Sequence, residues 1–334
     1  MRVGLAYDLS SEYEALGLSG EAIAEFDSEG TIEALEGAIR SLGYATDRIG
    51  SIRALAARLA DGEHWDLVFN ITEGLTGRSR EAQVPALLEA FGLPYTFSDP
   101  LVMAATLDKA VAKRLVRDEG VPTAPFALVR RVAEADAVDL PFPLFAKPVA
   151  EGTGKGVSPR SKVGSRAELR SICAELIARY AQPVLVETYL PGRELTVGIL
   201  GTGEGAWVLG SLEIELLAGA EPEVYSYLNK ERCEELVRYR LVRDATAVEA
   251  QRVALQAYRA LGMADAGRID LRCDGSGAPL FLEANALPGL HPTHSDLPIL
   301  ATQAGIGYRE LIGTIMEAAV TRQGVPGAVM RAAE

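Results

Sequence analysis

Cysteine is scarce in this chain, and the three that it has lie far apart. Cys173, Cys233 and Cys273 show neither the paired spacing of a zinc site nor the density of a disulfide scaffold. No stretch approaches the roughly 18 uninterrupted apolar residues that a membrane helix needs. The opening strand turns polar at Asp8 before a signal-peptide core develops. These shortages predict a protein of the reducing cytoplasm with no membrane partner.

Positive charge is also in short supply. The formal net charge is -13, and no run of Lys and Arg or basic-aromatic stripe interrupts that excess of acid. Such a chain repels a phosphate backbone, so nucleic acid is excluded as a partner. With 334 residues the chain is long enough for two or three domains, each with its own core.

The hydrophobic pattern predicts a mixed α/β and α+β protein of three segments. In residues 1–104 we expect strands at 3–7 and 66–70, helices at 31–42 and 81–91, and a loop from Pro94 to Thr106. In residues 105–187 we expect first a helix that opens at Thr106–Lys109, with Lys109 and Lys113 one turn apart, and closes at Gly120. Strands and loops follow from Val121, with one helix at 168–180. In residues 188–334 we expect strands near 194–200 and 206–214, a long helix ending near Leu261, two further strands, and a terminal helix at 308–320 followed by a dozen frayed residues.

The two late strands are predicted to form a hairpin around Ser276-Gly277. Strand periodicity and antiparallel pairing then set Asp270 opposite Glu283 and Arg268 opposite Asn285, with all four side chains on one face. The other face, which we expect to meet the core, carries Ile269, Leu271, Leu280, Leu282 and Ala284.

The opposed carboxylates of this hairpin favour a bound cation. Two acids about 5 Å apart destabilise a bare sheet. Two carboxylates and one amide oxygen are ligands that suit Mg²⁺. The alternative is a solvated polar face, which is the ordinary meaning of acidic strand residues.

Other segments are weak signals when each is taken alone. Lys147 ends an apolar strand and is followed by glycines at 152, 154 and 156, whose backbone N–H groups are suited to phosphate. The loop matches neither a Walker A sequence nor GxGxxG, and by itself indicates a flexible surface turn. Glu187 and Glu194 flank a Pro-Gly turn suited to adenine and ribose, or simply to joining two strands. Lys230 without context is a surface lysine.

Taken in order, these segments resemble the D-alanine:D-alanine ligase family of ATP-grasp enzymes over nearly the whole chain. The segments that carry the resemblance are Thr106–Lys109, Lys147–Gly156, Glu187 with Pro191–Gly198, Lys230, Arg268–Asp270 and Phe281–Leu290. The resemblance implies a three-domain ATP-grasp fold, with segments 1–104, 105–187 and 188–334 as its domains and ATP between the central and C-terminal ones. It also implies a possible homodimer.

The resemblance further implies roles by position. Lys109, Lys147 and Lys230 would contact the phosphates of ATP, Glu187 and Leu190 the adenine, and Glu194 the ribose. Asp270, Glu283 and Asn285 would hold two Mg²⁺ ions, or Mn²⁺ in their place, with Glu283 bridging them. The catalytic residues would be Arg268, as oxyanion stabiliser, Lys230, and Thr153 in the loop that closes over the site.

The sequence departs from the family where amino acids are selected. Glu12 stands nearest to the family's ammonium-binding glutamate, Glu73 replaces a histidine, and Ser295 lies where a second substrate's carboxylate is expected. Glu231 replaces a tyrosine, and Thr153-Gly154 replaces a serine pair. His291 and His294 lie near that site, but a loop histidine without a partner is more often solvent-exposed than catalytic, so neither is expected to be catalytic. The resulting hypothesis is an ATP-dependent ligase that joins an amino-acid carboxylate to an amine through an acyl phosphate.

Three alternatives remain open beside D-alanyl-D-alanine synthesis. The chain is either a ligase for a different dipeptide or natural-product amide, an inactive nucleotide-binding homologue, or an ATP-grasp enzyme that activates a carboxylate for a thiol or for carboxylation. No biotin or CoA signature supports the last of these.

Overall fold

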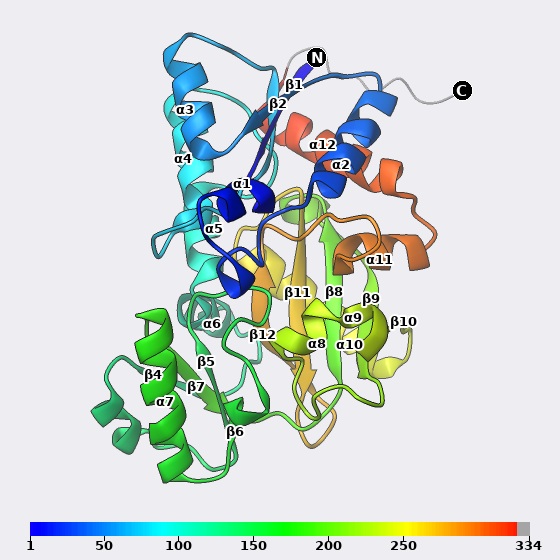
Figure 1. The fold of residues 1–334 in the computed structure, drawn as a ribbon. Coiled ribbons are helices and arrows are strands. Elements are labelled where there is room, and N and C mark those ends of the chain that lie inside the picture. The colour runs from blue at the N-terminus through cyan, green and yellow to red at the C-terminus, as the bar shows by residue number, and fades with distance from the viewer. Residues whose placement is uncertain (326–334) are drawn as a thin grey trace.

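The computed structural model describes residues 1–325, which form three β-sheets that follow one another along the chain (Figure 1). The first sheet is parallel, with order β2-β1-β3, and the other two are antiparallel, with orders β4-β7-β5-β6 and β10-β9-β8-β11-β12. The predicted boundaries at 104 and 187 keep each sheet within one segment, except for Thr188 at the end of β7. The division into domains itself stays a prediction.

The first unit surrounds the parallel sheet with helices. Its elements are β1 (Arg2–Tyr7), α1 (Ser10–Ala15), α2 (Glu29–Ser41), β2 (Ala45–Gly50), α3 (Ile52–Ala60), β3 (Leu67–Ile71), α4 (Gln83–Ala90) and α5 (Pro100–Leu107). Helix α2 begins earlier than predicted because the Ser28 side chain accepts a hydrogen bond from the Thr31 amide. The loop predicted between Pro94 and Thr106 is wrong, because α5 occupies most of it. Residues of α5 are apolar on nearly every side, so no helical periodicity marked it.

The middle unit is small and has its own core. Its elements are α6 (Lys109–Asp118), β4 (Phe126–Val129), β5 (Leu144–Pro148), β6 (Lys162–Val163), α7 (Arg166–Tyr180) and β7 (Val184–Thr188). Helix α7 covers the sheet and buries Leu169, Ile172 and Leu176 against it. Asp108 caps α6 by accepting from the amides of Ala110 and Val111, which positions Lys109 at the first turn.

The third unit is built on the five-stranded sheet. Its elements are β8 (Glu194–Leu200), β9 (Trp207–Leu216), α8 (Tyr227–Glu231), α9 (Cys233–Leu236), β10 (Val237–Leu241), α10 (Ala245–Ala260), β11 (Ala266–Cys273), β12 (Pro279–Asn285), α11 (Asp296–Gln303) and α12 (Tyr308–Gln323). Helices α10 and α11 pack on opposite faces of the sheet: Tyr258 of α10 approaches Gly267, whereas Leu297 of α11 approaches Gly198. The predictions missed β10 and α11. Most of the predicted frayed end lies outside the described residues.

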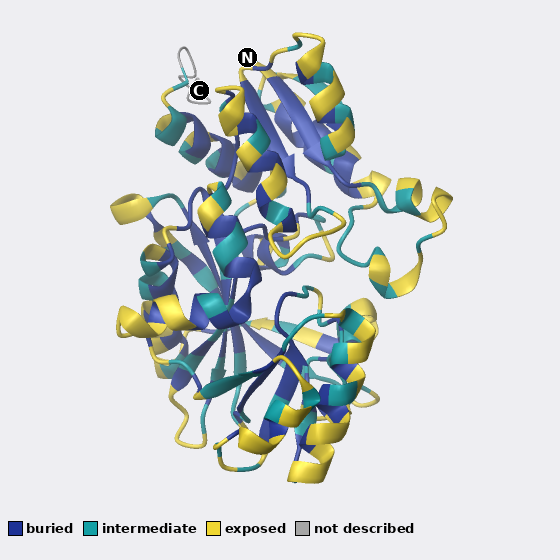
Figure 2. Ribbon diagram, turned by 90° about the vertical axis from the view of Figure 1, so that its left-hand side faces the viewer, coloured by how far each residue is buried: buried dark blue, intermediate teal, exposed yellow. Residues whose placement is uncertain are grey.

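The C-terminal helix returns to the first unit, where α12 lies beside α2 (Figure 1). One apolar cluster therefore runs from the parallel sheet through α5 and α12 into the five-stranded sheet. Figure 2 shows the central strands mostly buried and the outward faces of the helices exposed, whereas the edge strands β2, β4 and β10 are only partly buried. Within residues 1–325, no helix combines the length and the apolar character needed to cross a membrane.

A buried ion pair fastens α12 to the rest of the molecule. Asp265 is fully buried, and its carboxylate oxygens lie 3.0 and 2.7 Å from Nε and Nη2 of Arg322. Arg322 also donates to the carbonyl of Phe97 at 2.8 Å. The pair thus joins the third unit to the loop between α4 and α5.

We expect Arg322→Ala to lower the free energy of unfolding by about 3 kcal/mol, because it leaves the buried charge of Asp265 uncompensated. Urea unfolding measures this. Arg309→Ala is the matched control on the same helix. Its guanidinium is exposed and, among the described residues, bonds only to Ser41, so the change should stay within about 0.5 kcal/mol. Equal losses in both variants would contradict the role of the pair.

Candidate active site

The predicted register of the late hairpin is present at its centre. Strands β11 and β12 pair Asp270 with Glu283 and Arg268 with Asn285. A β-bulge then shifts the register after Asp270, so that Leu271 lies opposite Phe281.

Because of the bulge, the predicted core face of the hairpin is wrong for part of β12. Ile269, Leu271 and Ala284 are buried as predicted, but Phe281 takes the core position expected for its neighbours. Leu280 and Leu282 are only partly buried, and Leu282 lines a cavity instead. The prediction failed there because one extra residue in a strand reverses the face of every residue beyond it.

Arg268 is held between two carboxylates. Its Nε and Nη2 lie 2.9 and 3.0 Å from the oxygens of Asp270, and its Nη1 lies 3.1 Å from Asp296 Oδ2. Asn285 donates from Nδ2 to Asp270 at 3.1 Å, which leaves its own Oδ1 free to act as a ligand. The guanidinium is therefore fixed at the end of the hairpin face, beside the oxygen-rich group formed by Asp270, Glu283 and Asn285.

Lysines from the middle unit neutralise the hairpin. Nζ of Lys147 lies 3.4 Å and Nζ of Lys109 lies 3.7 Å from Glu283 Oε2. Burial by itself raises the pKa of Glu283, but these lysines, with Lys230 and Arg268, outweigh it and hold the pKa well below its ordinary value. Glu283 is therefore ionised and available to a cation at neutral pH.

Glu187 has a different environment from the one expected of an adenine contact. Its carboxylate lies 2.8 Å from Nζ of Lys113 and 3.3 Å from Nζ of Lys147, and all three residues are buried. Sequence reasoning placed Lys113 one turn after Lys109 but gave it no role. The structure shows that the carboxylate of Glu187 orients the side chains of Lys147 and Lys113.

A cleft between the middle and third units collects the residues predicted to bind the nucleotide. Its lining includes all six of them, Lys109, Lys147, Glu187, Leu190, Glu194 and Lys230, together with Asp270, Arg272 and Leu282. Glu194 lies 3.3 Å from Nη1 of Arg272, and burial raises the pKa of Glu194. We call this cleft the small cavity.

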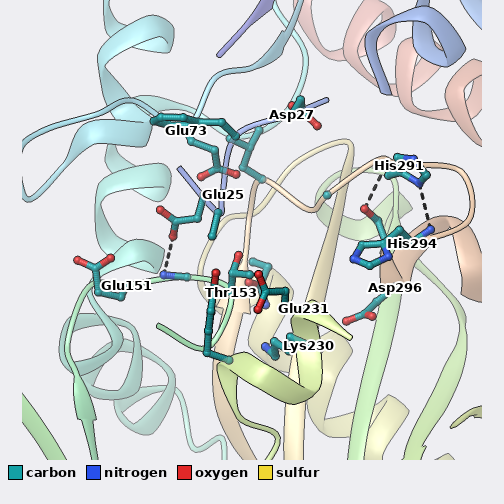
Figure 3. A pocket seen from close by; sticks show the side chains of 18 of the residues that line it. Glu25, Asp27, Glu73, Glu151, Thr153, Lys230, Glu231, His291, His294 and Asp296 are labelled. Atoms are coloured by element: carbon teal, nitrogen blue, oxygen red, sulfur yellow. Dashed lines mark hydrogen bonds between the residues drawn. The ribbon is translucent and has the colours of Figure 1, made fainter. Parts of the chain in front are cut away.

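A second cavity of about 580 Å³ lies between all three units (Figure 3). Arg268, Glu283 and Asn285 line one side, and the predicted residues Thr153, Lys230, Glu73 and Ser295 also face it. Lys109, Lys230 and Glu283 line both cavities, so the two meet at these side chains. We call this one the large cavity.

The structure does not bring Glu12 to this group. Glu12 is exposed on α1 and does not line the large cavity. Glu25 lies there instead, thirteen positions later in the chain, where no local pattern distinguished it from other surface acids. Ser295 accepts from the His291 amide at 3.0 Å, so its hydroxyl already braces the loop before α11.

Glu25 joins the first unit to the glycine-rich loop. It accepts from both Arg80 Nη2, at 3.0 Å, and Lys155 Nζ, at 2.7 Å, and from the Gly152 amide at 2.6 Å. A Cβ at position 152 would meet this carboxylate, so a larger residue there would displace the Glu25 side chain from the Gly152 amide. The loop that carries Thr153 is therefore held against the large cavity by a carboxylate with two cationic partners.

The large cavity is acidic. Its lining has nine carboxylate side chains and only three from Lys or Arg; the acids are Glu14, Glu25, Asp27, Glu73, Glu81, Glu151, Glu231, Glu283 and Asp296. Glu73 reaches the cavity from a turn that Asp8 stabilises by accepting from the Gly74 amide at 2.9 Å. Gly74 has φ 71°, and a side chain there would meet the Arg80 carbonyl. Burial and repulsion from Glu81 and Glu25 raise the pKa of Glu73 well above its ordinary value.

Comparison with known proteins places these features in a family. The model of the D-ala D-ala ligase C-terminus matches residues 115–317. A D-alanine–D-alanine ligase of Bordetella petrii is 36% identical over 275 residues, 81% of this chain and 80% of that protein. An uncharacterised protein of Sinorhizobium fredii is 37% identical over 262 residues, 77% of this chain and 75% of that protein.

The fold has the same relatives. The structure of a D-alanine–D-alanine ligase from Bacillus anthracis, complexed with ATP, matches with a TM-score of 0.74 at 23% identity, covering 98% of this chain and 100% of that one. This likeness confirms the predicted ATP-grasp fold.

One acid of the large cavity, Asp27, should make the stability of the protein depend on pH. Burial and the neighbouring Asp8 raise the pKa of Asp27 to about 7. The folded protein therefore binds more protons than the unfolded chain between about pH 4 and 7, and its stability falls as the pH rises through that range. We expect Asp27→Asn to remove this loss of stability. Its free energy of unfolding, relative to that of the parent protein, should rise by about 2 kcal/mol between about pH 5 and pH 8.

Chemical unfolding at both pH values, without substrate, measures the difference. Glu33→Gln removes an exposed acid from the neighbouring helix α2 and should follow the parent protein at both pH values. An Asp27→Asn variant whose pH dependence parallels that of the parent would contradict the assignment.

Proposed function

Because the chain belongs to the D-alanine–D-alanine ligase family and is an ATP-grasp ligase, we propose that it joins an amino-acid carboxylate to an amine through an acyl phosphate made from ATP. The single observation that carries the proposal is the meeting of the two cavities at Lys109, Lys230 and Glu283. A phosphoryl group leaving a nucleotide in the small cavity would arrive at a carboxylate in the large one at this junction.

The small cavity supplies what a triphosphate requires. Lys109, Lys147 and Lys230 present ammonium groups where phosphates would lie, and Leu190 offers an apolar contact to an adenine. Glu194 is available to ribose hydroxyls. Phosphoryl transfer depends mainly on positioning and on neutralising charge, and these fixed lysines serve both purposes.

The oxygen donors of the hairpin fit Mg²⁺. Asp270, Glu283 and the free amide oxygen of Asn285 form an all-oxygen set on one face, and Glu283 is ionised. These three residues would hold Mg²⁺. Bound there, Mg²⁺ would neutralise charge on the phosphates.

The remaining steps belong to side chains of the chain itself. A carboxylate is a poor acyl donor until its oxygen is phosphorylated, after which an amine attacks and phosphate leaves. Arg268, fixed by Asp270 and Asp296, would donate to the oxyanion of the tetrahedral intermediate, for which its planar fork is suited. The loop carrying Thr153, held by Glu25, would exclude water that hydrolyses the acyl phosphate.

An inactive nucleotide-binding homologue is the rival proposal. A protein that only binds nucleotide has no use for an arginine that lines the large cavity and is fixed there by Asp270 and Asp296. Retention of Arg268 beside Asp270, Glu283 and Asn285 therefore favours catalysis.

The test incubates the purified protein with Mg-ATP and pools of D- and L-amino acids and amines, following ADP release and the masses of new products. We expect ADP formation that depends on both a carboxylate and an amine. The mass of the new product should equal the sum of the masses of these two substrates minus one water. Nucleotide binding without any substrate-stimulated ADP release would favour the inactive homologue.

We expect Glu283→Gln to reduce turnover by about 10²- to 10³-fold or more, because it removes a carboxylate from the metal set and unbalances Lys109 and Lys147. Steady-state ADP release measures it, with thermal unfolding to establish that the variant is folded. Glu249→Gln, an exposed acid on α10, is the control and should keep parental turnover. A folded Glu283→Gln variant with parental turnover would remove the metal assignment.

A further inference from the structure

Strand β11 carries a third charged residue on the face that holds the metal donors. The period of two places Arg268, Asp270 and Arg272 on that face, and β8 pairs its own Glu194 with Arg272. The β-bulge of the hairpin lies on β12, so it leaves the pairing of β11 with β8 undisturbed. Arg272 and Glu194 therefore form a cross-strand pair of opposite charge beside the metal set, and both line the small cavity.

The contact between these two side chains uses only one oxygen of the carboxylate. Nη1 of Arg272 lies 3.3 Å from Glu194 Oε2. Arg193, the residue before Glu194, instead binds Glu213 through two nitrogens, at 2.7 and 2.9 Å. Among residues 1–325, Oε1 of Glu194 accepts no hydrogen bond. The guanidinium thus fixes one oxygen of Glu194, and the other remains available inside the small cavity.

Arg272 is itself held in place by two neighbouring segments. Its Nη2 donates to the carbonyl of Glu223 at 2.8 Å, and its guanidinium carbon lies 5.2 Å from the centroid of the Tyr189 ring. The Tyr189 hydroxyl donates to the same carbonyl at 3.2 Å. The guanidinium is therefore fixed by the linker after β7 and by the segment before α8, so it can hold Glu194 in one orientation.

Stability alone does not explain an arginine at this position. Its Nε is buried and has no acceptor in the part of the chain that the structure describes. A buried donor without an acceptor costs free energy, and such donors are uncommon in folded proteins. An arginine placed only to stabilise the sheet would have its buried donors paired. The position therefore indicates a role toward a molecule bound in the small cavity.

We propose that Arg272 is a positioning residue that sets the sugar specificity of the small cavity. It holds the Glu194 carboxylate as the acceptor for the sugar hydroxyls, so that ribonucleotides bind in preference to deoxyribonucleotides. This inference rests on the proposed function, in which the small cavity binds ATP, and it adds a residue and a selectivity to that function. Because Arg272 acts through Glu194, its loss should weaken most the nucleotide that offers both hydroxyls.

The test measures dissociation constants by calorimetry for ATP, 2′-deoxy-ATP and 3′-deoxy-ATP, with Mg²⁺ and without amino acids, so that no turnover is required. We expect the parent protein to bind at least one deoxy analogue about 10- to 100-fold more weakly than ATP, the range for a hydrogen bond to a charged group. Arg272→Met keeps much of the side-chain volume and removes the charge. It should reduce this preference to about 3-fold or less, because an acceptor that is free to turn away contributes little net free energy.

The control makes the same substitution elsewhere in the same sheet. Arg238→Met, at an exposed position of β10, should leave the preference for ATP unchanged. Arg272→Gln also removes the charge, and it carries the test if the methionine variant does not fold. Within one variant all three nucleotides meet the same folded molecules, so the ratio of their dissociation constants separates lost recognition from lost folding.

A double-mutant cycle shows whether Arg272 acts through Glu194. Glu194→Gln alone should remove the preference for ATP, and the addition of Arg272→Met should then change it no further. If Arg272→Met weakens ATP and both deoxy analogues equally, or if the double variant loses more preference than Glu194→Gln, the inference is overturned.

The outcomes separate this inference from the proposed function. A parent protein that binds all three nucleotides alike, yet releases ADP when given a carboxylate and an amine, overturns the inference and leaves the ligase intact. A preference for ATP that Arg272→Met removes, without any substrate-stimulated ADP release, supports the inference and overturns the ligase. A parent protein that binds none of the three nucleotides overturns both.

Discussion

The opposition of Asp270 and Glu283 across two paired strands is the constraint on which the site depends. Antiparallel pairing forces the two carboxylates together, and that repulsion must be balanced within the protein. Arg268 balances the first acid, and Lys109 and Lys147 balance the second. Because those lysines belong to α6 and β5, the charge of the hairpin draws the middle unit to the third unit at the place where a nucleotide would sit.

Charge pairing also joins the first unit to the glycine-rich loop, but here a single carboxylate serves several donors. Glu25 collects Arg80, Lys155 and the Gly152 amide, so one carboxylate satisfies donors from two units. A charge-assisted contact of this kind orders the loop at little cost in exposed area. It also leaves Glu73 and Glu81 without a partner, and the cavity becomes neutral near the reacting centre and acidic opposite it.

Local patterns predicted the parts of the site that lie on regular structure. The period of two set Asp270 against Glu283 correctly, and the helix signal after Asp108 placed Lys109. The period of two gave the wrong face for Leu280 and Leu282, because no feature of the sequence indicates the bulge. Helix α5 was not predicted because hydrophobic periodicity identifies only amphipathic helices. A helix that is apolar on nearly all sides shows no such periodicity.

Residues on loops were beyond such reasoning. Glu12 lies on α1 and Glu25 follows thirteen residues later, and only the path of the chain after α1 brings Glu25 to Arg80 and Lys155. The sequence by itself determined the family, the ATP-grasp fold, the hairpin and the lysines, since each depends on neighbours in the chain or on ordered motifs. Only the tertiary structure decided which acids share a cation and which face the cavity without one, because pairing of charges depends on distance in space, which separation along the chain does not determine.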